Sequence, residues 1–413
     1  MVLHTLKLLE FEKITDNIPQ YCLSEAGAAA LAVQTTTNNE KVWRERSSAV
    51  FALKKIFDDN LSLPAVVFPD IGGILIKSSV EGSVLDCPDV ASVLNFLNSA
   101  SSLKKSLSSL TENTYILEKL DFEDISDLTV YLSKYVTKEG VFRDENVKEL
   151  KEIRQKIGNV NKTINRIVSG YTNNPLVAPC LQENSSTIRD NRVVLPVKEN
   201  FKGKIKGIVH SASSRGMTLF IEPVELFEYN NEIIELEERY RIEILKILRI
   251  LTERIRDNNE IIRDIFKKIT FLDTIIARGR FAYINKCIMP EIIQKGIILK
   301  NARHFLLGNK AVPVDIIVNE KRKALLISGP NTGGKTLALK TAGLSILMNQ
   351  FCTGVLADEG SAVSMVDNVL ADIGDEQSIA GSLSTFSAHM KNIAEILELS
   401  TDKSFVLLDE PGT

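Results

Sequence analysis

One segment near the C-terminal end of the chain carries the residue types that bind phosphate. It runs Gly329-Pro330-Asn331-Thr332-Gly333-Gly334-Lys335-Thr336. Glycines let backbone N–H groups approach an anion without a Cβ in the way. A helix that begins near Lys335 would point its positive end at the same anion. The spacing Gly-x4-Gly-Lys-Thr is that of a Walker A loop, so it predicts a binding site for the phosphates of ATP.

The residues around this loop supply the strand–loop–helix context that such a loop needs. Ala324–Ile327 is apolar and predicts a short buried strand, and an apolar-periodic helix is expected after the loop. In that context Lys335 would reach the β- and γ-phosphates, and the Thr336 hydroxyl would help to bind Mg²⁺.

A second segment, Phe405–Leu408, predicts a buried apolar strand that ends in two acids, Asp409 and Glu410. Following a Walker A loop, this is the pattern of a Walker B strand. Asp409 would hold the Mg²⁺ shell through water, and Glu410 would orient or deprotonate the attacking water. Glu410 and Lys335 are therefore the candidate catalytic residues.

Between these segments, small hydroxyl residues stand at the start of a predicted helix. Ser384 and Thr385 could cap that helix, or they could present hydroxyl groups to the γ-phosphate of a second ATP. The residue pattern alone favours the cap. His389 follows on the same helix, and a structural role is the expectation for it.

Two long amphipathic helices are expected to position these parts. Apolar residues recur every three or four positions over about 143–168 and again over about 226–266. A helix of about 40 residues spans about 60 Å, which is longer than a compact domain and typical of a lever or coiled-coil arm. Residues 1–137 predict a helical scaffold, interrupted by a loop over 64–84, where Pro, a Gly pair and β-branched residues gather.

Between the long helices, residues 171–223 predict a small β-rich module. Segments 192–197, 205–209 and 217–221 are strand-like, and Ser213–Gly216 predicts the hairpin turn between the last two. The module concentrates basic residues in a chain of net charge −3: Arg189, Arg192, Lys198, Lys202, Lys204, Lys206 and Arg215. The pattern fits either contact with a phosphate backbone or an ordinary solvated surface.

The composition excludes several other classes of protein. The 5 cysteines are scattered and contain no Cys-x-x-Cys pair, which argues against a disulfide framework and against a zinc site. No signal peptide and no apolar run of about 20 residues is evident, so we expect no membrane contact and a cytoplasmic location. The length suits two to four domains.

Taken together, these motifs resemble those of the MutS family, and in particular its type-two branch. The resemblance rests on the Walker A loop, the Ser-Thr-Phe segment before the Leu-Leu-Asp-Glu strand, and segments characteristic of the branch. These segments are 194–198, 207–211, 218–223, 230–232 and 371–378.

The resemblance implies a multidomain α plus α/β fold. It consists of a helical core domain (1–137), an outgoing lever helix (138–170), a β-rich clamp (171–224), a returning lever helix with further core (225–298), and a P-loop ATPase domain (299–413). It also implies a homodimer with ATP and Mg²⁺ at the interface. Ser384 and Thr385 would then reach the γ-phosphate of the partner subunit, which reverses the preference drawn from the pattern alone.

The partners that the resemblance implies are DNA, in branched or recombining form, and stalled, collided ribosomes, which an ATP-driven conformational change would split. The family's later segments, with a switch histidine and an Smr nuclease domain, have no counterpart here, so we assign no nuclease activity and expect weak or no ATP turnover. The alternative is a non-hydrolysing remnant that binds nucleotide weakly or not at all. A chromosome-organising coiled-coil ATPase would have much longer arms.

Overall fold

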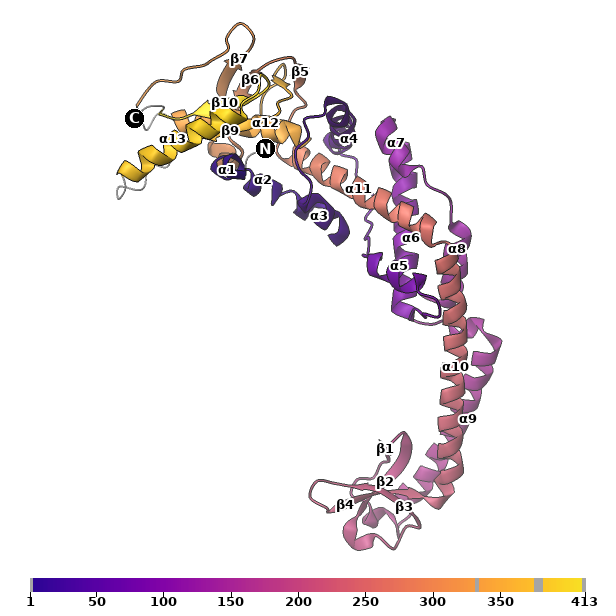
Figure 1. Ribbon diagram of the computed structural model, residues 1–413. Helices are drawn as coiled ribbons and strands as arrows, with labels where there is room; N and C mark the ends of the chain where they lie inside the picture. The colour runs from indigo at the N-terminus through magenta and orange to yellow at the C-terminus, as the bar shows by residue number, and fades with distance from the viewer. Residues whose placement is uncertain (1–2, 331–333, 375–381, 411–413) are drawn as a thin grey trace. The chain divides into compact units, whose positions relative to one another are not determined.

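The computed structural model combines helices with several small sheets (Figure 1). It describes residues 3–330, 334–374 and 382–410, the side chains of 382–388 excepted. The chain divides into two units: residues 1–72, 95–124 and 260–413 form unit 1, and residues 73–94 and 125–259 form unit 2. Within the described ranges, no helix has both the length and the apolar character needed to cross a membrane.

Unit 1 combines a helical part with an α/β part. The helices are α1 (Leu3–Leu8), α2 (Glu12–Thr15), α3 (Glu25–Ala32), α4 (Glu40–Asp58), α7 (Thr114–Leu120), α11 (Asn259–Ile284), α12 (Lys335–Gln350) and α13 (Ser382–Leu399), with the later part of α6 (Cys87–Leu110). The strands are β5 (Glu291–Ile293), β6 (Ile297–Ala302), β7 (Val314–Val318), β8 (Ala362–Ser364), β9 (Val369–Asp372) and β10 (Phe405–Leu408).

The strands of unit 1 form two separate sheets. One has the order β5-β8-β6-β7, with β5 and β8 parallel and β6 antiparallel to both β8 and β7. The other pairs β9 with β10 in parallel, Leu408 lying opposite Asp372. The carboxyl ends of parallel strands meet at one sheet edge, so the residues that follow β9 and β10 lie together.

Helix α12 is the central element of unit 1. Every residue of its second half, Thr341–Gln350, is buried, which is the mark of a helix enclosed on all sides. Near its C-terminal end, the carbonyl of Asn349 accepts a hydrogen bond from Trp43 Nε1 at 2.8 Å. The carbonyl of Phe351 accepts one from Arg278 Nε at 2.9 Å. Burial lowers the pKa of Arg278 to about 10, which leaves the guanidinium charged at neutral pH.

A glycine lets α12 approach β10 closely. A Cβ built on Gly343 would lie 2.7 Å from Leu407 Cδ1 and 2.7 Å from Leu9 Cδ1, closer than real Cβ atoms come. Gly343 stands seven residues, or two helical turns, after Thr336, so the two share one face of the helix. The close approach at Gly343 therefore brings the first turn of α12 to the end of β10.

Unit 2 contains the remaining helices and the β-rich module. The helices are α5 (Gly72–Ser79), the beginning of α6, α8 (Ser126–Tyr135), α9 (Lys148–Thr172) and α10 (Phe227–Asp257), and the strands are β1 (Thr187–Arg189), β2 (Arg192–Lys198), β3 (Gly207–Ala212) and β4 (Thr218–Pro223). The sheet is antiparallel with the order β1-β2-β4-β3. Helices α9 and α10 lie side by side and lead to this sheet (Figure 1).

One apolar core joins the two long helices to the sheet. It contains Val160, Ile164 and Val168 from α9, Leu195 and Val197 from β2, Ile221 from β4, and Ile233 and Leu236 from α10. The predicted helical periodicity of both segments is thus confirmed, as are the hairpin turn and its two strands.

A buried carboxylate ties the sheet to the first turns of α10. Glu222 is 1% exposed and accepts hydrogen bonds from Arg192 Nη1 (2.8 Å) and Asn230 Nδ2 (2.8 Å), and its other oxygen lies 2.6 Å from His210 Nε2. Burial alone would raise the pKa of Glu222, but the hydrogen bonds from Asn230, His210 and Arg192 outweigh it and leave the pKa lowered. The carboxylate therefore stays charged at neutral pH.

Two expectations about the helices are wrong in detail. The segment 64–84 is not loop throughout, because α5 forms at Gly72–Ser79, where Leu75 and Ser78 are buried. The second long helix does not run unbroken over 226–266: it ends at Asp257, and α11 continues from Asn259 to Ile284. Asn259, which is 8% exposed, donates hydrogen bonds to Leu75 O and Ser78 Oγ, both at 2.9 Å. These contacts favour a new helix start over helical continuity.

We expect Arg192→Ala to destabilise the β-rich module, because it removes a charged partner from a buried carboxylate. The cost should be about 3–5 kcal/mol, seen as a lower melting temperature and as faster hydrogen exchange of β2 and β4. Arg215→Ala is the matched control, since Arg215 is exposed in the same module. Equal stability of the two variants would contradict this role for Arg192.

Candidate functional site

The segment that is predicted to bind phosphate ends in a helix start of the predicted kind. Helix α12 begins at Lys335, and Gly334 before it adopts a left-handed conformation with φ 78°, which glycine tolerates without a Cβ clash. Lys335 Nζ donates a hydrogen bond to Gly329 O at 3.0 Å, so the lysine side chain turns back towards Gly329. Asn331, Thr332 and Gly333 lie outside the described residues, and Pro330 is exposed.

The two acids after β10 lie at this helix start. Thr336 Oγ1 donates a hydrogen bond of 2.6 Å to Asp409 Oδ2. Glu410 Oε1 lies 3.9 Å from Lys335 Nζ. Glu410 also adopts a positive φ of 45°, which is unfavourable for a residue with a Cβ and is found disproportionately at functional sites. Two pairs of neighbouring side chains, more than 70 positions apart in the sequence, thus lie together at the start of α12.

The donor set suits Mg²⁺ bound together with phosphate. Mg²⁺ uses one or two carboxylates and keeps water or phosphate oxygens in its remaining positions. Thr336 and Asp409 offer a hydroxyl and a carboxylate already within 2.6 Å of each other. The described residues contain no group of three or more His, Cys, Asp or Glu that could hold a metal ion alone. A cation here would therefore complete its coordination with water or with oxygens of a ligand such as a nucleotide phosphate.

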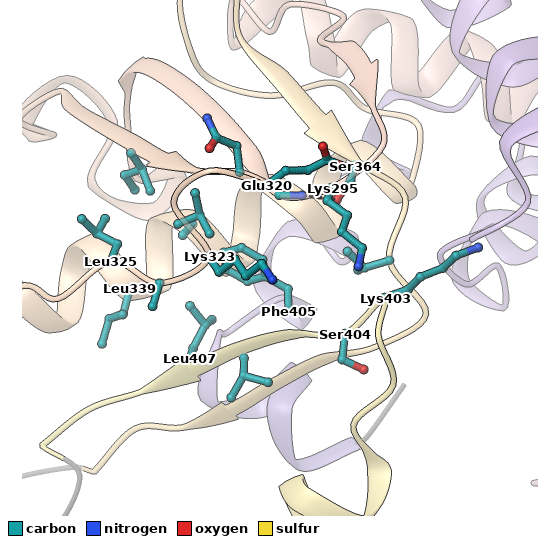
Figure 2. A pocket seen from close by; sticks show the side chains of 18 of the residues that line it. Lys295, Glu320, Lys323, Leu325, Leu339, Ser364, Lys403, Ser404, Phe405 and Leu407 are labelled. Carbon is teal, nitrogen blue, oxygen red and sulfur yellow. Dashed lines mark hydrogen bonds between the residues drawn. The ribbon is translucent and has the colours of Figure 1, made fainter.

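The predicted buried strand at Ala324–Ile327 is wrong. The segment is not a strand, and Leu326 is 90% exposed and Leu325 47% exposed. It borders a cavity of about 830 Å³ whose other walls include α12 and β10; Figure 2 shows Leu325, Leu339 and Leu407 lining it. A strand needs backbone partners along its edge, and the residues that the structure describes place no strand beside this segment.

The predicted strand Phe405–Leu408 forms, but it is only partly buried. Leu407 is 3% exposed because it packs towards Gly343, whereas Val406 and Leu408 are 40% and 38% exposed. Both of these residues line the same cavity. The expectation of a buried strand is therefore met only at Leu407, because β10 is paired on the β9 side alone within the described ranges.

The side chains of Ser384 and Thr385 lie outside the described residues, although the backbone of α13 is described from Ser382. Their assignment to the γ-phosphate of a partner subunit stays a prediction. His389 on the same helix lies 3.0 Å from Asp372 Oδ2, measured from its Nδ1. The sequence analysis did not connect these two residues; an acid at a strand end and a His-x-x-Asn pattern on a helix were the available signals.

The basic residues of the β-rich module divide into two groups. Arg192 is bound within the protein by Glu222 and Asn231, Arg189 lies 4.4 Å over the ring of Phe220, and Lys198 Nζ donates to Pro179 O at 2.9 Å. The others are exposed: Lys202, Lys204, Lys206 and Arg215. The surface formed by these last four residues is called the exposed basic patch below.

Comparisons with known proteins find relatives of this chain. Residues 325–413 match the family model for MutS domain V. The chain is similar to curated proteins named Endonuclease MutS2: 34% identical to that of Halothermothrix orenii over 99% of this chain and 53% of the relative, and 36% identical to that of Finegoldia magna over the same shares. The chain is thus similar to proteins of the MutS family over nearly its whole length.

Other MutS2 proteins show the same relation. The MutS2 of Aquifex aeolicus is 35% identical over 98% of this chain and 53% of its own length. The chain thus spans about half the length of the curated relatives it matches. The similarity to MutS2 proteins covers both units, including the β-rich module, whereas the domain V match covers the phosphate site alone.

We expect Thr336→Val and Asp409→Asn to weaken nucleotide binding when Mg²⁺ is present and to leave binding in EDTA nearly unchanged. Each variant removes one charge-assisted contact of about 1.5–3 kcal/mol, or about 10- to 150-fold in affinity. A fluorescent ATP analogue titrated with and without Mg²⁺ measures this. Thr353→Val, at a buried threonine away from the site, serves as the control. Weakening of equal size in EDTA would contradict a cation role for these residues.

Proposed function

We propose that this chain binds ATP with Mg²⁺ at the loop Gly329–Thr336 and holds nucleic acid with its β-rich module, as a MutS-like clamp. The observation that carries the nucleotide part is the 2.6 Å contact of Thr336 with Asp409 at the start of α12, beside Lys335 and Glu410. A helix N-terminus, a lysine, a hydroxyl and two carboxylates are together the groups that bind a nucleotide triphosphate and its cation.

In this proposal each side chain has one role. Lys335 binds the terminal phosphates, and the first turn of α12 directs its N–H groups at them. Thr336 and Asp409 hold the cation, which when bound neutralises charge on the phosphate oxygens. Glu410 orients the water that attacks, and its partial exposure leaves room for that water.

The exposed basic patch supports the nucleic-acid part. Lys202, Lys204 and Lys206 lie in the segment between β2 and β3, and Arg215 lies in the turn between β3 and β4. All four are exposed, and none forms an ion pair within the described part of the chain. Such a patch tracks phosphates without reading base sequence. The partners proposed are branched DNA and stalled ribosomes, with a homodimer in which Ser384 and Thr385 serve the partner subunit's nucleotide. The long helices α9 and α10 are proposed as levers between clamp and ATPase.

The alternative is a chain that binds nucleotide weakly or not at all and does not hydrolyse it. The exposed segment Ala324–Ile327 beside the cavity favours this alternative, because an unpaired segment before the loop leaves the phosphate site less rigid. The two functions differ in a measurable way, since only the first requires tight binding.

Titration of the chain with a fluorescent ATP analogue, with and without Mg²⁺, tests the nucleotide part. We expect saturable binding that Lys335→Ala weakens at least about 10-fold, because a charge-assisted contact to phosphate is lost. Lys310→Ala, at an exposed lysine outside the loop, is the control. Absence of binding at millimolar ATP would establish the alternative, and vigorous hydrolysis lost in Lys335→Ala would contradict the expected weak turnover.

For the nucleic-acid part, binding to duplex DNA, branched DNA and ribosomes is compared over a salt series. Changing the four residues of the exposed basic patch to glutamine should reduce the slope of log affinity against log salt by about 3–4, since each phosphate contact contributes about 0.9. Lys41→Gln with Lys310→Gln, both at exposed sites in unit 1, should leave the slope unchanged. An unchanged slope in the patch variant would contradict the clamp surface.

A further inference from the structure

We propose that Asp372, His389 and Asn392 form a polar latch that positions helix α13 against the carboxyl end of β9 and connects this helix to the phosphate site. The latch itself follows from the geometry of unit 1. Its service to nucleotide binding rests on the proposed function.

The latch is built on a buried carboxylate. Asp372 is the last residue of β9 and is 4% exposed. Both of its oxygens face α13: Oδ2 lies 3.0 Å from His389 Nδ1, and Oδ1 accepts from Asn392 Nδ2 at 3.2 Å. No lysine or arginine among the described residues forms an ion pair with it. Burying a carboxylate costs free energy unless hydrogen bonds satisfy it. His389 and Asn392 supply those hydrogen bonds, so their positions on α13 stabilise the buried Asp372.

The two donors stand three residues apart and therefore on one face of the helix. A carboxylate can only accept, so the Nδ1 of His389 carries the hydrogen that faces it. The ring also lies against the backbone of Gly374, where an added Cβ would stand 3.3 Å from His389 Cε1 and 3.4 Å from Nε2. The imidazole is thus held at its Nδ1 and on one flank.

Apolar packing gives the part of α13 from His389 to Leu399 little support. Of its described side chains, from His389 to Leu399, only Ile396 is buried. Met390 is 43% exposed and Leu397 is 74% exposed. Because burial of apolar surface usually fixes a helix in place, a helix with one buried apolar residue over this stretch depends on its polar contacts.

The latch continues into the phosphate site through a short path. The backbone carbonyl of Asp372 accepts from Asp409 N at 2.9 Å, as the strand pairing of β9 with β10 extends by one residue. Asp409 in turn accepts from the Thr336 hydroxyl at 2.6 Å. A change at Thr336 therefore reaches His389 on α13 through three hydrogen bonds, which are joined by the residues Asp409 and Asp372.

Hydrogen exchange of the full chain, followed by mass spectrometry, tests the latch in three variants of one residue. In His389→Ala, amides of α13 should exchange at least about 10-fold faster, since local opening becomes easier when contacts are lost. His389→Asn places an amide donor near the position of Nδ1 and should return exchange to within about threefold of the wild type. His389→Gln places its donor nearer to Nε2 and should not restore it.

Internal and external controls separate this result from general unfolding. Lys391→Ala, at an exposed site on the same helix, should leave α13 unchanged. Amides of α12 and of β2–β4 should keep their protection in every variant, which shows that the rest of the chain is folded. Unchanged exchange of α13 in His389→Ala, or equal behaviour of the Asn and Gln variants, overturns the latch.

The connection to the phosphate site has its own readout. In the wild type, ATP analogue with Mg²⁺ should slow the exchange of α13 amides, and His389→Ala should abolish this slowing while α12 still responds. An equal response of α13 in both proteins overturns the connection. If the wild type binds no nucleotide, the proposed function fails and the connection with it, and the exchange of the nucleotide-free protein still decides the latch.

Discussion

Helix α12 is the element on which the rest of unit 1 depends, because its two ends are held by different interactions. At the C-terminal end, Trp43 and the charged Arg278 donate to the carbonyls of Asn349 and Phe351, where a helix carries partial negative charge. The second half of the helix is fully enclosed. The N-terminal end is left to face the loop, with its partial positive charge directed at whatever anion the loop binds.

Close packing of α12 against β10 fixes the position of the two acids that follow this strand, Asp409 and Glu410. Because Gly343 lets α12 approach β10, the end of that strand stands beside the first turn of the helix. Thr336 then meets Asp409, and strand pairing places Asp372 next to Asp409. The fixed helix thus organises, in order, the loop, the two acids after β10 and the buried carboxylate that holds α13. Each step is a direct contact, so a displacement of α12 would disturb all of them.

In unit 2, the buried carboxylate of Glu222 holds several elements together in a similar way. Glu222 links strands β2, β3 and β4 with the start of α10, since its partners Arg192, His210 and Asn230 come from three separate elements. Such a network is costly when incomplete and rigid when every member is satisfied. It explains why a charged residue in a basic module need not face solvent: Arg192 serves the fold, whereas the lysines after β2 remain exposed.

The sequence by itself determined the features that depend on local spacing. It predicted the helix that begins near Lys335, the acids that follow an apolar strand, the two long amphipathic segments and the hairpin around Ser213–Gly216. In each case the residue pattern is itself the physical cause. Glycine allows a backbone conformation that other residues disfavour, and apolar residues at helical spacing form one face that can be buried. These features depend on residues that are neighbours along the chain, so distant contacts are not needed to predict them.

Only the tertiary structure decided which residues meet and which surfaces are covered. Ala324–Ile327 has the composition of a buried strand, but burial requires a partner that composition does not reveal, and the segment is exposed. The helix break at Asn258 arises from contacts of Asn259 with α5, far away in sequence. The contacts of Arg192 with Glu222 and of His389 with Asp372 likewise depend on how distant elements pack together. Strand partners and buried ion pairs depend on long-range packing, whereas turns, caps and helical periods depend on neighbours along the chain.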